Sequence, residues 1–415
     1  MSFVDDLITL HCPNGVEFKL LGEVGEFIRG NGLQKSDFVE AGVGAIHYGQ
    51  IHTHYDTWTT VTKSFVSEEL ASRLRKANTG NLLIATTSED DDAVAKAVAW
   101  LGIGEIAISG DAHIYRHTLD PKYVSYFFQS TQFQDQKKKH ITGLKVRRIS
   151  GDALAKIRIP VPPLEAQHEI VRILDTFSEL TSELTSELTS RRMQYEYYRD
   201  QLLRFESTEV EWTQLGSIYE SSSGLSKSAD QFGFGQPFLS FKTVFNNSVV
   251  PTVLPDLVNA SESEKKRFSI KKGDVFVTRT SEDLEGLGMS CAALEDYPHA
   301  TFNGFTKRLR PKNEGVVHPK FSAYFFRSTH FRTQIARTAV LSTRTSLNDD
   351  ILLRIRMPLP PFPEQVRIVN ILDKFDALTR SVSDGLPREI ELRRKQYEYY
   401  RNLLFSFPES IEAQA

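Results

Sequence analysis

The longest regular pattern of hydrophobic positions lies between residues 164 and 205. Its apolar residues recur mostly at alternating steps of three and four, the spacing of a helix with a narrow coiled-coil seam. Neither Pro nor Gly interrupts the run, so the pattern predicts one continuous helix of ~60 Å at a rise of 1.5 Å per residue. The seam consists of Ile170, Ile173, Phe177, Leu180, Leu184, Leu188, Tyr195, Tyr198, Leu202 and Phe205.

Nearly the same stretch returns at the C-terminus. IRIPVPPLEAQHEIVRILDTF (157–177) corresponds to IRMPLPPFPEQVRIVNILDKF (355–375), and RRMQYEYYRDQLLRF (191–205) corresponds to RRKQYEYYRNLLFSF (393–407). The two 15-residue tails agree at 10 positions, which identifies the chain as an internal duplication. The second copy also contains Gly385 and Pro387. This pair predicts a helix end and restart, so the second copy is expected to be two helices or one kinked helix.

Two mixed segments of ~140 residues, a length typical of one domain, precede the helical stretches. They begin with VEFKLLGEV at Val16 and VEWTQLGSI at Val210. Short apolar or β-branched runs broken by Gly, Asn, Asp and Ser predict strands in both segments. The clearest of these runs are 41–49, 81–88, 105–109, 237–245 and 273–281.

A second duplicated block closes each mixed segment. PKYVSYFFQSTQF (121–133) corresponds to PKFSAYFFRSTHF (319–331). Its spacing predicts a helix whose aromatic face packs in the core. On that face lie Tyr123, Tyr126, Phe127 and Ser130 in the first copy, and Phe321, Tyr324, Phe325 and Ser328 in the second.

These patterns predict an α+β chain in which two globular mixed α/β modules are separated by long helices. An apolar seam on an isolated helix needs a partner, and the other copy of the seam is the nearest one. Antiparallel pairing of the two helices as a coiled coil would give an internal pseudo-twofold axis. The expected interface residues are Ile170, Phe177, Leu184, Leu188, Tyr195, Tyr198, Ile368, Phe375, Tyr397 and Tyr400.

Net charge, cysteine content and the lengths of the apolar runs limit the classes of function that the chain can have. The net charge is −3 over 415 residues, so a nucleic-acid surface would have to be a local basic patch. The two cysteines, Cys12 and Cys291, occupy unrelated places, which argues against a disulfide framework or a zinc site and favours a reducing, cytoplasmic setting. No apolar run reaches the ~20 residues that span a bilayer, and the N-terminus lacks a basic leader, so we expect a soluble, non-secreted protein without membrane contact.

The strongest candidate for a binding surface is the basic segment 134–150. It carries no acidic residue between Lys137 and Gly151, and the equivalent second segment carries none from Phe331 to Asn348. Basic loops interleaved with Thr, Ser and His suit contacts to phosphates and base edges. A solvated surface loop is the alternative, but basic loops at equivalent places in both copies favour DNA. The candidate DNA-binding residues are Lys137, Lys138, Lys139, Lys145, Arg147 and Arg148, then Arg332, Arg337 and Arg344, with Lys227 as a weaker one.

A long helix between two reading modules would act as a ruler. The stretch 178–190 repeats the unit TSEL. Each added unit of four residues would lengthen the helix by ~6 Å and rotate its far end by ~40°. That length corresponds to one to two base pairs of B-form DNA, at about 3.4 Å per step.

The sequence lacks the motifs of the catalytic classes that could act on DNA. It contains neither the usual amine-methylating tetrad nor a Gly-rich phosphate loop. Pro255-Asp256 followed by Glu264-Lys265-Lys266 imitates a nuclease motif, but the spacing is short and the first module has no counterpart. The histidines do not recur between modules and lack suitably spaced Cys or carboxylate partners. We therefore expect no catalytic residue and no metal site.

The duplicated layout, the PPLEAQHEIVRILDTF and PPFPEQVRIVNILDKF entries, the TSEL tandem and the two QYEYYR tails resemble the specificity subunit of type I restriction–modification enzymes. The resemblance covers residues 1 to 407. It implies target-recognition domains at 1–155 and 208–353 and helical spacer regions at 156–207 and 354–410. One departure concerns the Glu-Gln pair, which is intact as Glu364-Gln365 but reads Glu165-Ala166-Gln167 in the first copy.

The resemblance also implies a function. Each recognition domain would read one half of a split, asymmetric site in double-stranded DNA, while the spacers set the gap and dock two methyltransferase (M) subunits. Restriction (R) subunits would join that core. Adenine methylation from S-adenosylmethionine and ATP-driven, Mg-dependent cleavage would belong to those partners, so this chain is expected to be non-catalytic and to bind no cofactor itself.

Two other classes of protein remain as alternatives. A non-catalytic coiled-coil scaffold with two protein-binding heads would explain the duplication but would leave the basic loops without a role. A stand-alone nuclease or methyltransferase would need motifs that the sequence lacks.

Overall fold

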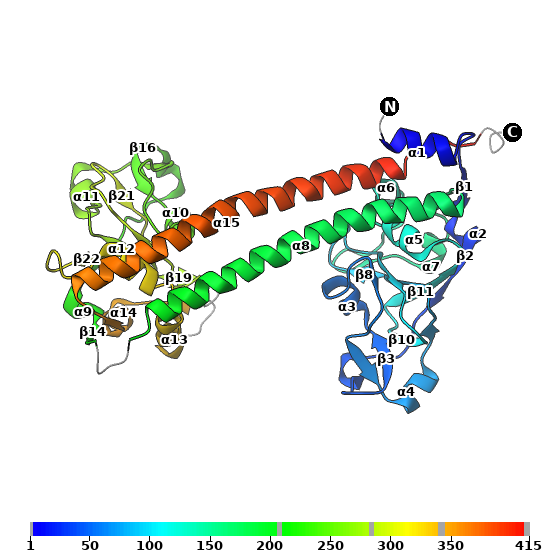
Figure 1. Cartoon of the computed structure of the whole chain (residues 1–415), viewed down its shortest axis with the longest axis horizontal. Coiled ribbons are helices and arrows are strands. Elements are labelled where there is room, and N and C mark those ends of the chain that lie inside the picture. The colour runs from blue at the N-terminus through cyan, green and yellow to red at the C-terminus, as the bar shows by residue number, and fades with distance from the viewer. Residues whose placement is uncertain (1–2, 206–209, 282–285, 339–344, 411–415) are drawn as a thin grey trace. The chain divides into compact units, whose positions relative to one another are not determined.

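The computed structural model describes residues 3–205, 210–281, 286–338 and 345–410. Internal contacts divide the chain into unit 1 (Met1–Thr185 with Arg388–Ala415) and unit 2 (Ser186–Pro387). Each unit contains one mixed module and part of two long helices, α8 (Leu164–Leu202) and α15 (Phe362–Leu404) (Figure 1). Because this division cuts both helices, it does not test the domain boundaries expected from the sequence, and those stay a prediction.

The module of unit 1 is built on two sheets. One has five strands in the order β2-β11-β7-β9-β4, the other four strands in the order β5-β3-β10-β6, and two-stranded pairs join β1 to β13 and β12 to β8. The strands are β1 (Glu17–Leu20), β2 (Gly25–Arg29), β3 (Val43–Ile46), β4 (Trp58–Thr59), β5 (Ser64–Val66), β6 (Lys76–Ala77), β7 (Leu82–Ala85), β8 (Thr87–Ser88), β9 (Lys96–Trp100), β10 (Ile106–Ile108), β11 (Ala112–His117), β12 (Arg147–Arg148) and β13 (Arg158–Val161). The helices are α1 (Phe3–His11), α2 (Leu21–Val24), α3 (Tyr48–Thr53), α4 (Glu68–Arg73), α5 (Pro121–Phe127), α6 (Thr131–Lys138) and α7 (Gly151–Leu154).

The module of unit 2 has a four-stranded sheet in the order β15-β22-β18-β20 and a three-stranded sheet in the order β17-β16-β21, with the pairs β14-β24 and β19-β23. Its strands are β14 (Trp212–Gln214), β15 (Tyr219–Ser223), β16 (Phe232–Leu239), β17 (Asp256–Val258), β18 (Val275–Thr278), β19 (Thr280–Ser281), β20 (Ser290–Ala292), β21 (Thr301–Phe302), β22 (Thr306–Pro311), β23 (Thr345–Ser346) and β24 (Arg356–Pro358). Its helices are α9 (Leu215–Ile218), α10 (Phe241–Asn246), α11 (Glu262–Arg267), α12 (Pro319–Phe325), α13 (Thr329–Thr338) and α14 (Asp349–Arg354).

The duplicated aromatic block is buried as expected, but it forms two helices in each unit instead of one. Tyr123, Tyr126 and Phe127 on α5 are fully buried, as is Ser130. The helix breaks because the Ser130 hydroxyl caps a new helix, accepting a hydrogen bond from the backbone N–H of Phe133 at 3.3 Å. Ser328 ends α12 and begins α13 in the same way.

Two other expectations from the sequence are corrected. The run 237–245 is strand only as far as Leu239, because Ser240 caps helix α10 by accepting from the backbone N–H of Thr243 at 3.3 Å. Of the two alternatives for the second long helix, the end and restart at Gly385 is wrong, since α15 continues through Pro387 as one helix. The alternative of a kink there stays a prediction. The first long helix begins at Leu164 as expected and ends at Leu202.

A glutamine at the start of each long helix ties the helix to its module. The Gln167 amide donates to the Pro162 carbonyl oxygen at 2.8 Å and accepts from the backbone N–H of Asp120 at 2.9 Å. Gln365 makes the equivalent bonds to Pro360 at 2.9 Å and His318 at 2.8 Å. Both glutamines are buried. The offset of 198 residues pairs Gln167 with Gln365, so the first copy keeps the glutamine and places Ala166 where the second has Glu364.

About two turns further along, a carboxylate repeats the attachment. Asp175 on α8 accepts from the Lys122 ammonium at 2.6 Å and from the Tyr126 hydroxyl at 2.7 Å. Asp373 on α15 does the same with Lys320 and Tyr324, at 2.6 and 2.7 Å. The buried frame is therefore the same in both units.

Within each unit, one end of α8 and the opposite end of α15 lie side by side and run in opposite directions (Figure 1). In unit 1 Phe177 stacks on Tyr400 with ring centroids 5.4 Å apart, and in unit 2 Phe375 stacks on Tyr198 at 5.3 Å. These pairs confirm the predicted antiparallel pairing inside each unit. Of the other expected seam residues, Ile170 and Ile368 are fully buried, whereas Leu184, Leu188, Tyr195 and Tyr397 are half-buried.

Candidate nucleic-acid interface

The basic segment of unit 1 folds as the end of helix α6 followed by a narrow loop. The backbone groups of Thr142 and Arg148 exchange two hydrogen bonds, of 2.9 and 2.8 Å, which close the loop at its base. Gly143 adopts a left-handed conformation with φ of +89°, which an L side chain would strain. Strand β12 then pairs with β8, Arg147 opposite Ser88 and Arg148 opposite Thr87. The loop 142–148 is therefore held on both sides.

Four of the predicted cations lie exposed on this segment: Lys138, Lys139, Lys145 and Arg148. Lys138 contacts Asp135 at 3.1 Å on the surface of α6, an exposed pair of little energetic weight. Leu144, at the tip of the loop, is 94% exposed. Exposed cations around an exposed loop tip form a surface that can approach a phosphate backbone.

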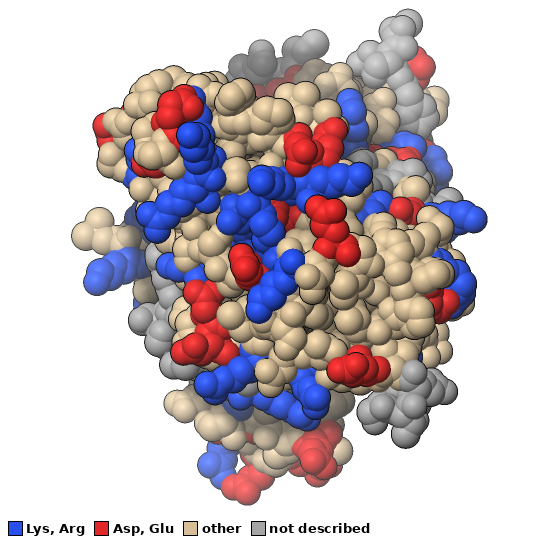
Figure 2. Space-filling model, turned by 90° about the vertical axis from the view of Figure 1, so that its left-hand side faces the viewer, with Lys and Arg blue, Asp and Glu red and all other residues tan. Residues whose placement is uncertain are grey.

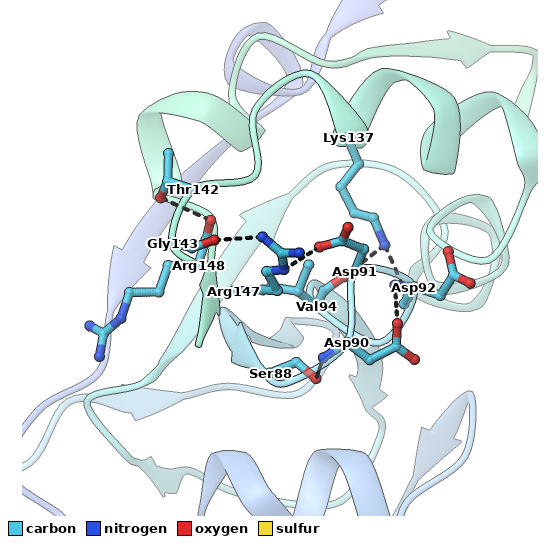
Figure 3. A network of polar contacts seen from close by, with 10 residues as sticks. All are labelled: Ser88, Asp90, Asp91, Asp92, Val94, Lys137, Thr142, Gly143, Arg147 and Arg148. Atoms are coloured by element: carbon cyan, nitrogen blue, oxygen red, sulfur yellow. Dashed lines mark hydrogen bonds and ion pairs between the residues drawn. The ribbon is translucent and has the colours of Figure 1, made fainter. Parts of the chain in front are cut away.

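Lys137 is a correction to the sequence-based prediction. Its side chain is fully buried, and its ammonium donates to the carbonyl oxygens of Asp92 and Val94 at 3.0 Å each (Figure 3). It cannot reach a phosphate from there. Burial lowers the pKa of Lys137 to about 8. The equivalent residue of unit 2 is Ile335, which is also buried, so this position belongs to the module core.

The lowered pKa predicts a pH dependence of stability. Above pH 8 the folded protein gives up the Lys137 proton while the unfolded chain holds it to about 10.5. The unfolded state therefore binds more protons in this window, and the contribution of Lys137 to stability rises with pH between about 8 and 10.5. Lys137→Met is expected to remove that contribution, measured as the difference between the melting temperatures of the two proteins from pH 7 to 10.5. A constant difference over the whole range would contradict it.

Arg147 is held differently from the exposed cations. Its Nε lies 2.7 Å from Asp91 Oδ1, and its Nη1 donates to the Gly143 carbonyl oxygen at 2.6 Å (Figure 3). Asp91 belongs to an acidic turn, residues 89–92, between β8 and β9. The sequence-based reading missed this turn, although a signal was present: TSED occurs at 87–90 and again at 280–283. Glu282 and Asp283 of the second copy lie outside the described residues.

The predicted cations of unit 2 form a weaker group. Arg332 is half-buried and donates to the Leu287 carbonyl oxygen and to the Met289 sulfur, the latter at 2.8 Å. Arg337 is exposed, and Arg344 lies outside the described residues. Lys227 pairs with Glu264 at 2.7 Å, and this contact holds the pKa of that carboxyl at about 2. On the face that Figure 2 draws, Lys and Arg side chains are interspersed with Asp and Glu.

Two of the histidines that the sequence analysis did not assign to a metal site make contacts within the fold. His47 caps helix α3 by accepting from the backbone N–H of Gly49 at 3.1 Å, and His52 Nε2 lies 2.9 Å from the Thr87 carbonyl oxygen. Burial lowers the pKa of His113 and of His117 to about 4. Across the described ranges, no group of three or more His, Cys, Asp or Glu side chains is arranged to hold a metal ion. No helix in the described part of the chain is long and apolar enough to cross a membrane.

Comparison with known proteins identifies the family. The family described as type I restriction modification DNA specificity domain matches residues 13–191 and again residues 208–392. The chain belongs to this family. The specificity subunit of the Escherichia coli enzyme EcoR124I/EcoR124II is 37% identical over 305 residues, covering 69% of this chain and 71% of the relative. A specificity subunit of Haemophilus influenzae, S.HindORF215P, is 30% identical over 329 residues, covering 75% of this chain and 79% of the relative.

Solved structures agree in fold. A chain from a study of complex assembly and conformational transition of a type I restriction–modification system aligns with a TM-score of 0.60. The alignment has 16% sequence identity and covers 95% of this chain and 98% of the other. As a type I specificity subunit, the chain is a non-catalytic component of a restriction–modification complex, and the two matched family domains correspond to the internal duplication.

Proposed function

We propose that this specificity subunit reads a split, asymmetric site in double-stranded DNA, with the module of each unit recognising one half. The single observation that carries the proposal is that the two units share the same buried contacts but differ in the segments that follow α6 and α13. The buried frame is the same in both units, as the Gln167–Gln365 and Asp175–Asp373 equivalences indicate. The segments that follow in the sequence differ, because Arg147 and Arg148 stand where the second unit has Thr345 and Ser346. One scaffold with two different reading surfaces suits a site with two different halves.

The exposed cations of unit 1 supply the attraction to DNA in this proposal. Lysine and arginine side chains that neutralise phosphates position a protein on the duplex without reading its sequence. Lys138, Lys139, Lys145 and Arg148 are suited to this role by their exposure. Lys137 is excluded from it by burial.

The long helices are proposed to set the gap and to dock two methyltransferase subunits, with restriction subunits joining through that core. The TSEL units lie inside α8, which is helical from Leu164 to Leu202, so an inserted unit would extend one continuous helix. S-adenosylmethionine, ATP and Mg are assigned to the partner subunits, in keeping with the lack of a catalytic motif in this chain.

A map of N6-methyladenine in a genome that carries this chain and its cognate methyltransferase subunit tests the proposal. The expected result is a two-part methylated motif that disappears when the gene for this chain is deleted. Methylation that persists unchanged after deletion would contradict the proposal and favour a scaffold with two protein-binding heads.

A further inference from the structure

The two arginines of the loop 142–148 differ: Arg147 is half-buried and Arg148 is exposed. Arg147 is anchored at two of its nitrogen atoms, by Asp91 at 2.7 Å and by the Gly143 carbonyl oxygen at 2.6 Å. Arg148 is exposed, and no carboxylate among the described residues forms an ion pair with it. We propose that Arg147, positioned by Asp91, reads a guanine in the half-site recognised by unit 1, whereas Arg148 contacts phosphate. This inference rests on the proposed function, namely that unit 1 binds DNA.

The acidic turn that carries Asp91 is held by hydrogen bonds within the turn and to Ser88. The Asp90 carboxylate accepts from the backbone N–H of Asp92 at 3.0 Å, the Asp90 carbonyl accepts from the N–H of Val94 at 3.1 Å, and the Ser88 hydroxyl accepts from the N–H of Asp90 at 3.2 Å. The buried Lys137 ammonium then fixes the far end of the turn through the carbonyl oxygens of Asp92 and Val94 (Figure 3). This gives Lys137 a function: it holds the turn in which Asp91 sits.

The backbone of Arg147 is equally fixed. Its neighbour Arg148 is bonded to Thr142 on one side, and strand β12 is paired with β8 on the other. The acidic turn follows β8 directly, so Asp91 lies three residues beyond the strand that pairs with the strand of Arg147. Their contact is therefore built into the strand pairing and does not depend on two long side chains meeting by chance.

The anchored guanidinium keeps the donors that base reading needs. Arginine has five N–H donors in a planar fork. The Nε edge of the fork faces the Asp91 carboxylate in an ion pair, and the Gly143 carbonyl oxygen accepts from one N–H of Nη1. The other N–H of Nη1 and both on Nη2 remain for a base. Arginine that donates to O6 and N7 of guanine is the commonest specific contact in the major groove, and its value depends on a fixed orientation of the fork.

The charge of Asp91 favours base reading over phosphate binding. A carboxylate 2.7 Å from Arg147 offsets the positive charge that a phosphate would seek and repels the phosphate itself. A neutral pair of this kind weakens binding to arbitrary DNA while leaving directional hydrogen bonds available, and this arrangement raises specificity. Arg148 has the opposite character, because its charge is exposed and uncompensated among the described side chains.

Three variants of the chain, each assembled with its methyltransferase subunit, test the inference. Arg147→Lys keeps the charge and loses the planar fork, and Asp91→Asn keeps the shape of the anchor and loses its charge. Arg116→Lys, at an exposed arginine paired with Glu26, is the matched control. In a methylated-motif map we expect the first two to relax the same guanine position in one half-site, by about 5- to 150-fold in discrimination. The control is expected to leave the motif unchanged.

A binding measurement separates the possible outcomes. A duplex with 7-deazaguanine at the assigned position lacks the N7 acceptor, so it should weaken binding of the wild-type complex more than it weakens binding of Arg147→Lys. An unchanged motif in Arg147→Lys would overturn the inference, as would equal relaxation by Arg116→Lys. A wild-type complex without any two-part motif would instead refute the proposed function. If Asp91→Asn lowers the melting temperature, its motif no longer tests the inference. The Arg147→Lys and 7-deazaguanine results then test it by themselves.

Discussion

Phe405→Ala is expected to lower the free energy of unfolding of unit 1 by about 3–5 kcal/mol, the usual cost of deleting a buried phenylalanine ring. Phe405 is 1% exposed, and its ring centroid lies 5.0 Å from that of Tyr123 and 5.7 Å from that of Phe127. The substitution would leave a cavity where the end of the chain packs against the aromatic helix α5. The measurement is urea unfolding followed by the fluorescence of Trp58 and Trp100, which both lie in unit 1.

The matched control is Tyr399→Ala, six residues earlier in the same C-terminal segment. Tyr399 is 63% exposed, so its removal should change the free energy of unfolding by no more than about 0.5 kcal/mol. Equal effects of the two substitutions would mean that the C-terminal segment is not part of the core of unit 1.

Replacing the four exposed cations Lys138, Lys139, Lys145 and Arg148 together by Gln is expected to weaken DNA binding of the assembled complex by about 10²–10³-fold near 0.15 M salt. Each phosphate contact contributes about 0.9 to the slope of log K against log salt. The slope should therefore become shallower by about 3 to 4. The measurement is a titration of the complex with duplex DNA at several salt concentrations.

The control for this variant removes an equal charge elsewhere in unit 1. Lys19, Arg73, Lys76 and Arg116 each pair with a carboxylate, and their joint replacement by Gln should leave the slope unchanged. If the control lowers the slope as much as the four-cation variant does, the DNA surface of unit 1 lies somewhere other than on the basic segment.

The parts of the fold that follow from periodic patterns were predictable. The seam of α8 follows from the spacing of its apolar residues. The antiparallel pairing of this seam with the second helix follows from the duplication, because the second helix carries the same seam. The break at Ser130 was harder to foresee, because a serine that caps a helix and a serine inside a helix occupy the same place in an apolar pattern. At Pro387 the error is of the opposite kind. The proline predicted a helix end, but α15 continues through it, because the residues on both sides of Pro387 favour one helix.

The candidate site was only partly predictable for a related reason. A run of basic residues gives the charge of a segment but not the direction of each side chain. Lys137 lies one helical turn after Phe133 on α6 and shares its buried face, so its ammonium points into the module. The pairing of Arg147 with Asp91 joins positions 56 residues apart, and only the strand pairing of β12 with β8 brings them together.

The central claim, that the modules read two half-sites and that α8 sets the gap between them, is tested most directly by inserting one TSEL unit after Leu188. The methylated motif of the variant is then compared with that of the wild-type complex. The account predicts that both half-sites keep their sequences and that the gap between them grows by one to two base pairs, from the ~6 Å rise of four helical residues. An unchanged gap, or a change in either half-site, would contradict it.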